Sequence, residues 1–331
     1  MRISARAALA AVLLAGFAVS AHAQWTWTPQ TGRWVNMKRL PKETAELQIE
    51  YARGLMLQGD YRKAYRETDK FTQFYAGDPM ADENQFLRGE ILLAQGKRME
   101  AAKAFQQLLA GYPDTKRYGD AIKKQYEIGD RYYDQGLQRI DKRFALFKKR
   151  PLKRAAEVYA MVVENQPFTA EAAEAQYKIG LSHYARKEYI ESAFEYRRVV
   201  EDYAGSDFVD EASFGLAMCY YKASLPPAYD QAPSQLAVDA VDEFKARYPQ
   251  DERNAELVGK RAEMRESMAA QRLATARFYE KRRDFPAARI YYEAVARDFN
   301  DTQAAGTAQS WIEANGGVTH VGLKYGANGA R

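Results

Sequence analysis

The sequence predicts an all-α protein, a solenoid of about six helix hairpins preceded by a short extended arm. Small residues recur at two fixed places in successive helical segments, and glycine-centred turns join some of those segments. Punctuation typical of strands and turns is sparse, with 11 prolines and 21 glycines in 331 residues. The composition, 47% hydrophobic and 28% charged, excludes a disordered chain, so most of the sequence can bury a core.

The first 23 residues have the pattern of an export signal. A charged start with Arg2 and Arg6 is followed by an apolar stretch and, at 21–23, by the small-x-small cleavage pattern Ala-His-Ala. The apolar run is too short for a membrane-spanning helix, which needs about 20 residues. We therefore expect residues 1–23 to be a cleaved signal peptide and the mature chain to begin at Gln24 in the periplasm.

Residues 24–42 are expected to form a Trp-rich extended arm or a small hairpin, not a helix. Trp25 and Trp27 alternate with threonines, and a Pro-Gln-Thr-Gly turn signal separates them from Trp34. Two roles stay open for this arm. It packs onto the first repeat, or it binds a partner.

The repeat region, residues 43–315, is recognised from two turns. Gln-Gly at 58–59 is followed by Ala64, and Gln-Gly at 95–96 is followed by Ala101. Both stretches resemble the bend of a tetratricopeptide hairpin. In that repeat the eighth and twentieth positions are small, because the two helices of a hairpin touch there, backbone to backbone. All twelve such places in the sequence hold Ala, Gly or Ser: Ala52, Gly89, Gly129, Gly180, Ala217 and Ala276 at the eighth position, and Ala64, Ala101, Ala155, Ser192, Ala237 and Ala288 at the twentieth.

The later hairpins are interrupted or extended. Residues 138–150 interrupt the third hairpin and residues 225–230 the fifth, and insertions in solenoids lie on one face, often the binding face. The sixth pair has a long first helix, at about 252–281, and a short helix at about 304–314 caps the last apolar face. Residues 316–331 are glycine-rich and are predicted to be a disordered tail.

Three stretches in the C-terminal part carry a family resemblance. Residues 239–249 read DAVDEFKARYP, residues 276–282 read ARFYEKR and residues 294–302 read AVARDFNDT. They resemble the Phe-x-x-x-Tyr-Pro helix end, the long bridging helix and the Asp-Thr exit of the BamD (YfiO, ComL) family of outer-membrane assembly lipoproteins, with the best match over 207–314. The chain is thus identified as similar to that tetratricopeptide family, in a variant form.

The resemblance implies a non-catalytic periplasmic scaffold that assists insertion of β-barrel proteins into the outer membrane. Its implied partners are proteins: a barrel-assembly subunit of the BamA type, accessory envelope proteins, or unfolded outer-membrane protein segments. Family members carry a lipid-modified cysteine after the signal, whereas this sequence has no cysteine before Cys219. The resemblance therefore does not extend to a lipid anchor, and we expect attachment that is at most peripheral to the inner face of the outer membrane. A basic residue that members place in the long helix falls at Ser267, so that contact is not transferred.

Other function classes lack their residues in this sequence. Histidines are few, the single cysteine lies in an apolar stretch, and no metal cluster or phosphate-binding loop is apparent, so we expect no cofactor, no metal and no enzymatic activity. Removal of Arg2 and Arg6 lowers the formal charge from +5 to +3, too weak a field to favour nucleic acid. The alternative function is another cell-envelope adaptor, of the Tol-Pal or peptidoglycan-associated type, because this fold binds many partners.

Two groups of residues are candidate binding surfaces. Aromatic residues at the groove-facing places of the first helices predict a partly apolar trough for an extended peptide or a strand edge: Phe86, Tyr126, Tyr133, Tyr177, Tyr184, Phe214 and Tyr221. Alternatively, individual rings fill the core between repeats. The insert of the third hairpin alternates basic and apolar side chains, which could contact an anionic membrane or an acidic partner, or cover the adjacent repeats: Phe144, Phe147, Lys148, Lys149 and Arg150.

Overall fold

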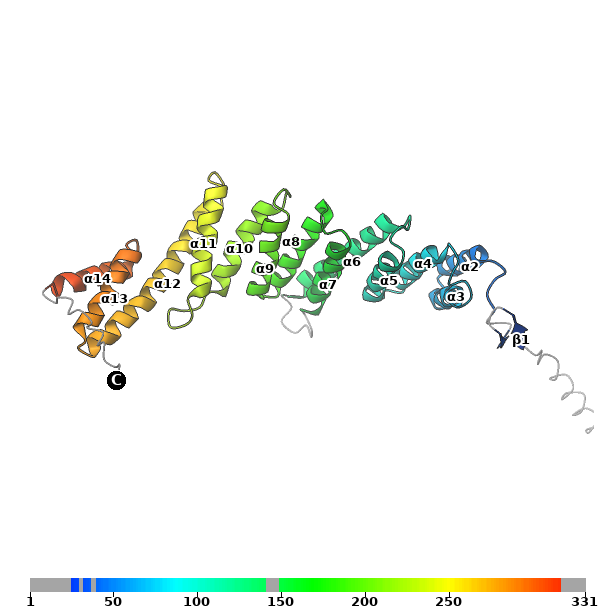
Figure 1. The fold of residues 1–331 in the computed structure, drawn as a ribbon, viewed down its shortest axis with the longest axis horizontal. Coiled ribbons are helices and arrows are strands. Elements are labelled where there is room, and N and C mark those ends of the chain that lie inside the picture. The colour runs from blue at the N-terminus through cyan, green and yellow to red at the C-terminus, as the bar shows by residue number, and fades with distance from the viewer. Residues whose placement is uncertain (1–24, 30–31, 37–39, 141–148, 317–331) are drawn as a thin grey trace, which may run out of the picture. The chain divides into compact units, whose positions relative to one another are not determined.

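The computed structural model describes residues 25–29, 32–36, 40–140 and 149–316. The predicted signal peptide, most of the basic insert and the tail beyond Gly316 lie outside these residues. The chain divides into two compact units, Met1–Ile128 (unit 1) and Gly129–Arg331 (unit 2). In the described parts of both units the architecture is all-α apart from one two-stranded hairpin, as the sequence predicted (Figure 1).

The N-terminal arm is an antiparallel hairpin of β1 (Trp25–Thr28) and β2 (Arg33–Asn36). Gly32 has φ of 61°, a left-handed conformation that suits glycine in a tight hairpin turn. The register places Trp27 directly opposite Trp34. The extended arm predicted from the alternation of Trp and Thr is therefore confirmed.

Unit 1 contains two helix hairpins and the start of a third. They are formed by α2 (Ala45–Leu57), α3 (Tyr61–Phe74), α4 (Ala81–Ala94), α5 (Arg98–Gly111) and the first part of α6 (Tyr118–Ile140). Gly59 and Gly96 end α2 and α4 with φ of 81° and 78°. Their left-handed backbone closes the turn, and the next helix starts two residues later.

Unit 2 continues the same pattern. It contains the rest of α6, α7 (Arg150–Asn165), α8 (Ala170–Ala185), α9 (Tyr189–Asp202), α10 (Val209–Ala223), α11 (Ala232–Arg247), α12 (Asn254–Lys281), α13 (Phe285–Asp298) and α14 (Gln303–Ala314). The long α12 and the short α14 lie where the sequence placed a long helix and a final cap. No helix among the described residues is both long and apolar enough to cross a bilayer.

All twelve small repeat positions are buried. The glycines at the eighth position make room for aromatic rings of the facing helix, which the sequence argument did not foresee. A Cβ added at Gly89 would lie 2.4 Å from the Phe105 ring, and one at Gly180 would lie 2.6 Å from Tyr196. Direct contact of the two helices is also present, because the Ser192 hydroxyl donates to the carbonyl oxygen of Gly180 (2.8 Å).

Gln231 holds the inserted loop of the fifth hairpin, residues 225–230, through hydrogen bonds. Its side-chain amide lies within hydrogen-bond distance of three carbonyl oxygens of the loop, those of Leu225, Pro226 and Tyr229. Its own carbonyl oxygen accepts from the Ser267 hydroxyl of α12 (3.0 Å). Ser267 therefore orders this loop, at the place where the resembled family often has a basic residue.

Candidate functional site

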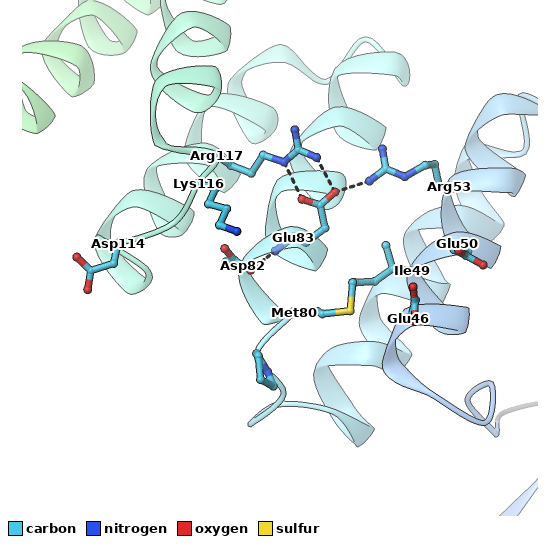
Figure 2. Close-up of a pocket in the computed structure, with 11 residues that line it drawn as sticks. Glu46, Ile49, Glu50, Arg53, Met80, Asp82, Glu83, Asp114, Lys116 and Arg117 are labelled. Carbon is cyan, nitrogen blue, oxygen red and sulfur yellow. Dashed lines mark hydrogen bonds and ion pairs between the residues drawn. The ribbon is translucent and has the colours of Figure 1, made fainter.

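The candidate site is an open pocket of about 770 Å³ in unit 1, between α2, α4 and the turn that leads into α6 (Figure 2). Glu46, Ile49, Glu50 and Arg53 line it from α2, and their i, i+3, i+4, i+7 spacing puts them on one helix face. Other lining residues come from the two connections and the start of α4: Pro79, Met80, Asp82, Glu83, Asp114, Lys116 and Arg117. Pro79 and Met80 provide accessible apolar surface, whereas Ile49 is only 3% exposed, and the other lining residues are charged.

Glu83 is the centre of the charge arrangement. Arg117 donates to both of its carboxylate oxygens, from Nε to Oε2 (2.7 Å) and from Nη2 to Oε1 (3.0 Å). Arg53 donates to Oε1 from the opposite side (Figure 2). The hydrogen bond to Glu83 raises the pKa of Arg117 above its ordinary value. Since these residues come from three successive first helices or their approaches, Glu83 links neighbouring repeats.

Two further carboxylates support this arrangement. Asp82 accepts a hydrogen bond from the Thr115 hydroxyl (2.6 Å), which holds the turn before α6 against the start of α4. Glu90, two turns further along α4, is half-buried, and its Oε2 lies 3.8 Å from Arg53. Burial raises the pKa of Glu90, because the charged carboxylate loses hydration that the distant guanidinium only partly replaces.

The pocket is acidic overall, with five carboxylates and three basic side chains among its lining residues. Glu83 neutralises part of the charge of Arg53 and Arg117. Glu46, Glu50 and Asp114 are exposed, so their carboxylates stay hydrated and accessible to a ligand. This geometry suits an extended peptide that presents a basic side chain to the wall of α2 and an apolar one to Pro79 and Met80.

The pocket lining contains carboxylates and basic side chains but no histidine, cysteine, serine or tyrosine. Across the described chain, no group of three or more His, Cys, Asp or Glu side chains could hold a metal ion. The arrangement can therefore bind a charged segment, and its residues form no nucleophile and base pair.

In unit 1, the two rings predicted to line an aromatic trough, Phe86 and Tyr126, are buried and half-buried. Phe86 is only 4% exposed and packs against Phe105, with ring centroids 5.5 Å apart. The Arg117 guanidinium covers the other side of the Phe86 ring, 5.0 Å from its centroid. Tyr126 is half-buried. In this unit the ring of Phe86 fills the core, and the surface above it is charged.

In unit 2 the predicted rings are half-buried and contact other side chains of the chain. Tyr177 stacks on Phe208, with centroids 5.5 Å apart, and burial raises the pKa of Tyr177 to about 12. Tyr184 meets Tyr189 edge to face at 5.5 Å. Burial also raises the pKa of Tyr133.

Tyr221 and Phe214 lie beside the long helix α12. The Tyr221 hydroxyl donates to Glu263 (2.6 Å) and accepts from Lys260 (3.2 Å), whose ammonium lies 4.5 Å from the ring centroid. Arg253 lies 5.1 Å above the Phe214 ring and pairs with Glu211 (3.1 Å). Phe86 and Phe214 stand at the same place in their repeats, three residues before the small eighth position. In both cases an arginine that directly precedes the next first helix covers the ring, Arg117 over Phe86 and Arg253 over Phe214.

Of the five insert residues predicted as contacts, only Lys149 and Arg150 are described. Lys149 precedes α7 and Arg150 begins it, and both are exposed. Phe144, Phe147 and Lys148 lie outside the described residues, so a contact made by this insert stays a prediction. In the arm, Trp27 and Trp34 are 52% and 67% exposed, whereas the side chain of Trp25 is not among those described.

Sequence reasoning missed Arg53, Glu83 and Arg117. A partial signal existed, because an acidic residue stands three places before the ring in both Glu83-x-x-Phe86 and Glu211-x-x-Phe214, and in both cases an arginine directly precedes the first helix of the following repeat. The spacing alone is not sufficient. Glu174-x-x-Tyr177 has it too, but there Phe208 precedes the next first helix and the Tyr177 ring stacks on it.

Comparisons with known proteins agree with this fold. A tetratricopeptide repeat profile matches residues 83–115, and the profile of a family described as YfiO, outer membrane lipoprotein, matches residues 133–319. No curated protein matches the chain.

Similar solved structures include three tetratricopeptide or related proteins. A thermophilic tetratricopeptide repeat protein of Thermus thermophilus has 15% identity and a TM-score of 0.31, with 67% of this chain and 98% of that chain covered. A repeat protein of Parabacteroides merdae has 16% identity and a TM-score of 0.30, with 82% and 93% covered. The MamA protein has 17% identity and a TM-score of 0.32, with 65% and 95% covered.

Proposed function

Because the chain belongs to the YfiO (BamD) outer membrane lipoprotein family, we propose that it is a periplasmic scaffold that assists assembly of β-barrel proteins in the outer membrane. It does so by binding other proteins and catalyses no reaction. Its partners are a barrel-forming subunit of the BamA type, accessory envelope proteins, or unfolded segments of the barrel proteins. It works at the inner face of the outer membrane.

The extent of the family match carries this proposal. The match at 133–319 includes every helix from α7 to α14, whereas the tetratricopeptide match lies in unit 1. The chain is thus a tetratricopeptide protein of the BamD type, and both families consist generally of non-catalytic scaffolds.

Affinity purification of the tagged full chain from native membranes tests the proposal. Recovery of the barrel-forming subunit, identified by mass spectrometry, is the expected result. Recovery of Tol-Pal or peptidoglycan-binding proteins alone would instead support the other type of envelope adaptor and overturn the assignment.

The pocket in unit 1 is proposed to hold an extended segment of an unfolded client. The expected client has a basic side chain near Glu46 and Glu50, because these exposed carboxylates form one wall. An ion pair with a solvent-exposed carboxylate contributes about 0.2–1 kcal/mol. Loss of one such contact should therefore weaken binding by at most about fivefold.

Fluorescence anisotropy with a labelled peptide from the terminal strand of an outer-membrane β-barrel measures this binding. The double variant Glu46→Lys, Glu50→Lys should raise Kd about tenfold or more, since it also reverses the charge of the wall. The matched control, Glu171→Lys with Glu191→Lys, changes two exposed acids of unit 2 and should leave Kd unaltered. Equal affinities for both double variants would exclude this pocket as the peptide site.

A further inference from the structure

The N-terminal hairpin presents two large rings on one face. Trp27 and Trp34 are directly opposite each other in the β1–β2 ladder, so their side chains project from the same side of the hairpin. They are 52% and 67% exposed. A two-stranded hairpin is marginally stable by itself in water, and indole rings at this exposure gain free energy when a partner covers them.

The sequence of the arm carries charge of one sign. From Gln24 to Lys42 it contains four basic residues, Arg33, Lys38, Arg39 and Lys42, and no acidic residue. The whole chain has 49 Lys and Arg against 44 Asp and Glu, so these four residues make up most of its excess of positive charge. The arm is therefore a local positive segment that also carries exposed tryptophans.

We propose that the Trp27–Trp34 face of this hairpin binds the interface of an anionic lipid bilayer. Indole rings concentrate at the boundary between headgroups and acyl chains, because their apolar body enters the hydrocarbon edge while the N–H stays hydrated. Each basic residue held near an anionic surface adds about a fivefold gain in binding. Tryptophans and basic residues with no acidic residue among them, in one short sequence segment, match both requirements. Lys42 of this segment also contacts the repeats, because its ammonium lies 3.9 Å from the centroid of the Tyr51 ring.

Pairing of the hairpin with the open strand edge of another protein is the main rival, and the observations favour it less. Edge pairing uses backbone groups and makes no demand for basic residues or for two adjacent indoles. The family is described as a lipoprotein, which places its members at a membrane. Cys219, the single cysteine of the sequence, is buried in α10, so a lipid on its sulfur could not reach a bilayer.

Co-flotation with vesicles tests the proposal on the exported, processed chain. Mass spectrometry first establishes its N-terminus and whether a lipid is bound. Vesicles of phosphatidylethanolamine with about 30% phosphatidylglycerol, an anionic content that gives a strong surface potential, are compared with neutral phosphatidylcholine vesicles. Wild-type protein should float with the anionic vesicles, and the bound fraction should fall as salt increases.

Replacement of both rings, Trp27→Ser with Trp34→Ser, should lower the partition coefficient at least about tenfold. Arg33→Gln should lower it about fivefold. Phe168→Ser is the matched control, because Phe168 is the most exposed large ring of the described chain at 94% and lies in unit 2. Circular dichroism checks that the helices are intact in each variant.

Three results would overturn the proposal. They are no flotation of the wild-type chain, equal flotation of the double Trp variant, and flotation that appears only when another envelope protein is added, which would indicate a protein partner for the hairpin. Membrane contact through these rings is independent of which protein the repeats bind. Loss of vesicle binding with unchanged peptide affinity would separate the two activities.

Discussion

Substitution of Gly89 by alanine should destabilise unit 1, although alanine is the better helix former. The added Cβ would lie 2.4, 2.7 and 2.8 Å from three atoms of the Phe105 ring, whereas carbon atoms at rest are about 3.5–4.0 Å apart. Phe105 is fully buried and packs against Phe86, so its ring can move only by disturbing other core side chains.

Two opposing effects determine the sign. Alanine gains about 1 kcal/mol of helix propensity over glycine, whereas overpacking a close-packed core costs about 1–3 kcal/mol and occasionally more. With a displacement of about 1 Å required of a fully buried ring, we expect overpacking to exceed the gain, for a net loss of about 1–2 kcal/mol. Gly54 of α2 is the matched control, since a Cβ there would meet nothing within 4 Å. Gly54→Ala should therefore stabilise by about 0.5–1 kcal/mol.

Repeat proteins often unfold in more than one step, so hydrogen exchange of the α4 and α5 amides is the appropriate assay, together with urea unfolding of the full chain. Gly89→Ala should accelerate exchange in these helices, and Gly54→Ala should slow exchange in α2. In a Phe105→Leu background the cost of Gly89→Ala should vanish or reverse, because the smaller side chain leaves room for the methyl group. Stabilisation by Gly89→Ala in the wild-type background would refute the reasoning, since it would mean that the Phe105 ring moves aside with no loss of stability.

Three further predictions concern buried polar groups. Glu280 accepts hydrogen bonds from the Tyr292 hydroxyl (2.7 Å) and the Trp311 indole N–H (2.9 Å). Glu280→Ala should therefore lower the free energy of unfolding in urea by about 2–3 kcal/mol, and Glu280→Gln should lower it less. A change under about 0.5 kcal/mol for Glu280→Ala would contradict this role. Burial raises the pKa of the Cys219 thiol to about 12. Iodoacetamide should therefore modify this thiol at least about a hundredfold more slowly in the folded chain than in urea. Similar rates in the two conditions would disprove its protection. Burial also raises the pKa of the Glu90 carboxyl above 4.5, so the folded state binds the carboxyl proton more tightly than the unfolded state does. The stability that this proton contributes is present in acid and is lost as pH rises through the raised pKa. Glu90→Gln should remove this loss of stability above pH 4.5. Identical pH profiles for variant and wild type would show that Glu90 is not the cause.

The helices and their pairing could be predicted because their requirements are local. A hairpin of two closely packed helices needs small residues at the crossing, so Gly180 and Ser192 are recognisable from spacing alone. The turn at Gly59 is equally local, because its left-handed backbone suits glycine. Lys187 shows the limit of this rule. With φ of 64° it occupies the same place in the turn after α8 without being glycine.

The candidate site could not be predicted in the same way. Arg117 and Glu83 are 34 residues apart, and charged residues are spread along the whole sequence. Only the stacking of one repeat on the next decides which of them meet. The same stacking turns Phe86, predicted as a groove residue, into a core residue under a guanidinium.

The sequence by itself therefore determined the all-α repeat architecture, the Trp-rich hairpin arm and the family, since each depends on residues close together in the chain. The tertiary structure alone decided which surface the repeats present. A side chain at a groove position is exposed or covered according to the residue that the following repeat places above it, and Arg117 and Arg253 come from the following repeat in both cases. For that physical reason the sequence left open whether these rings line a trough or fill the core, whereas in unit 1 the structure shows Phe86 as a covered core ring and an acidic pocket nearby.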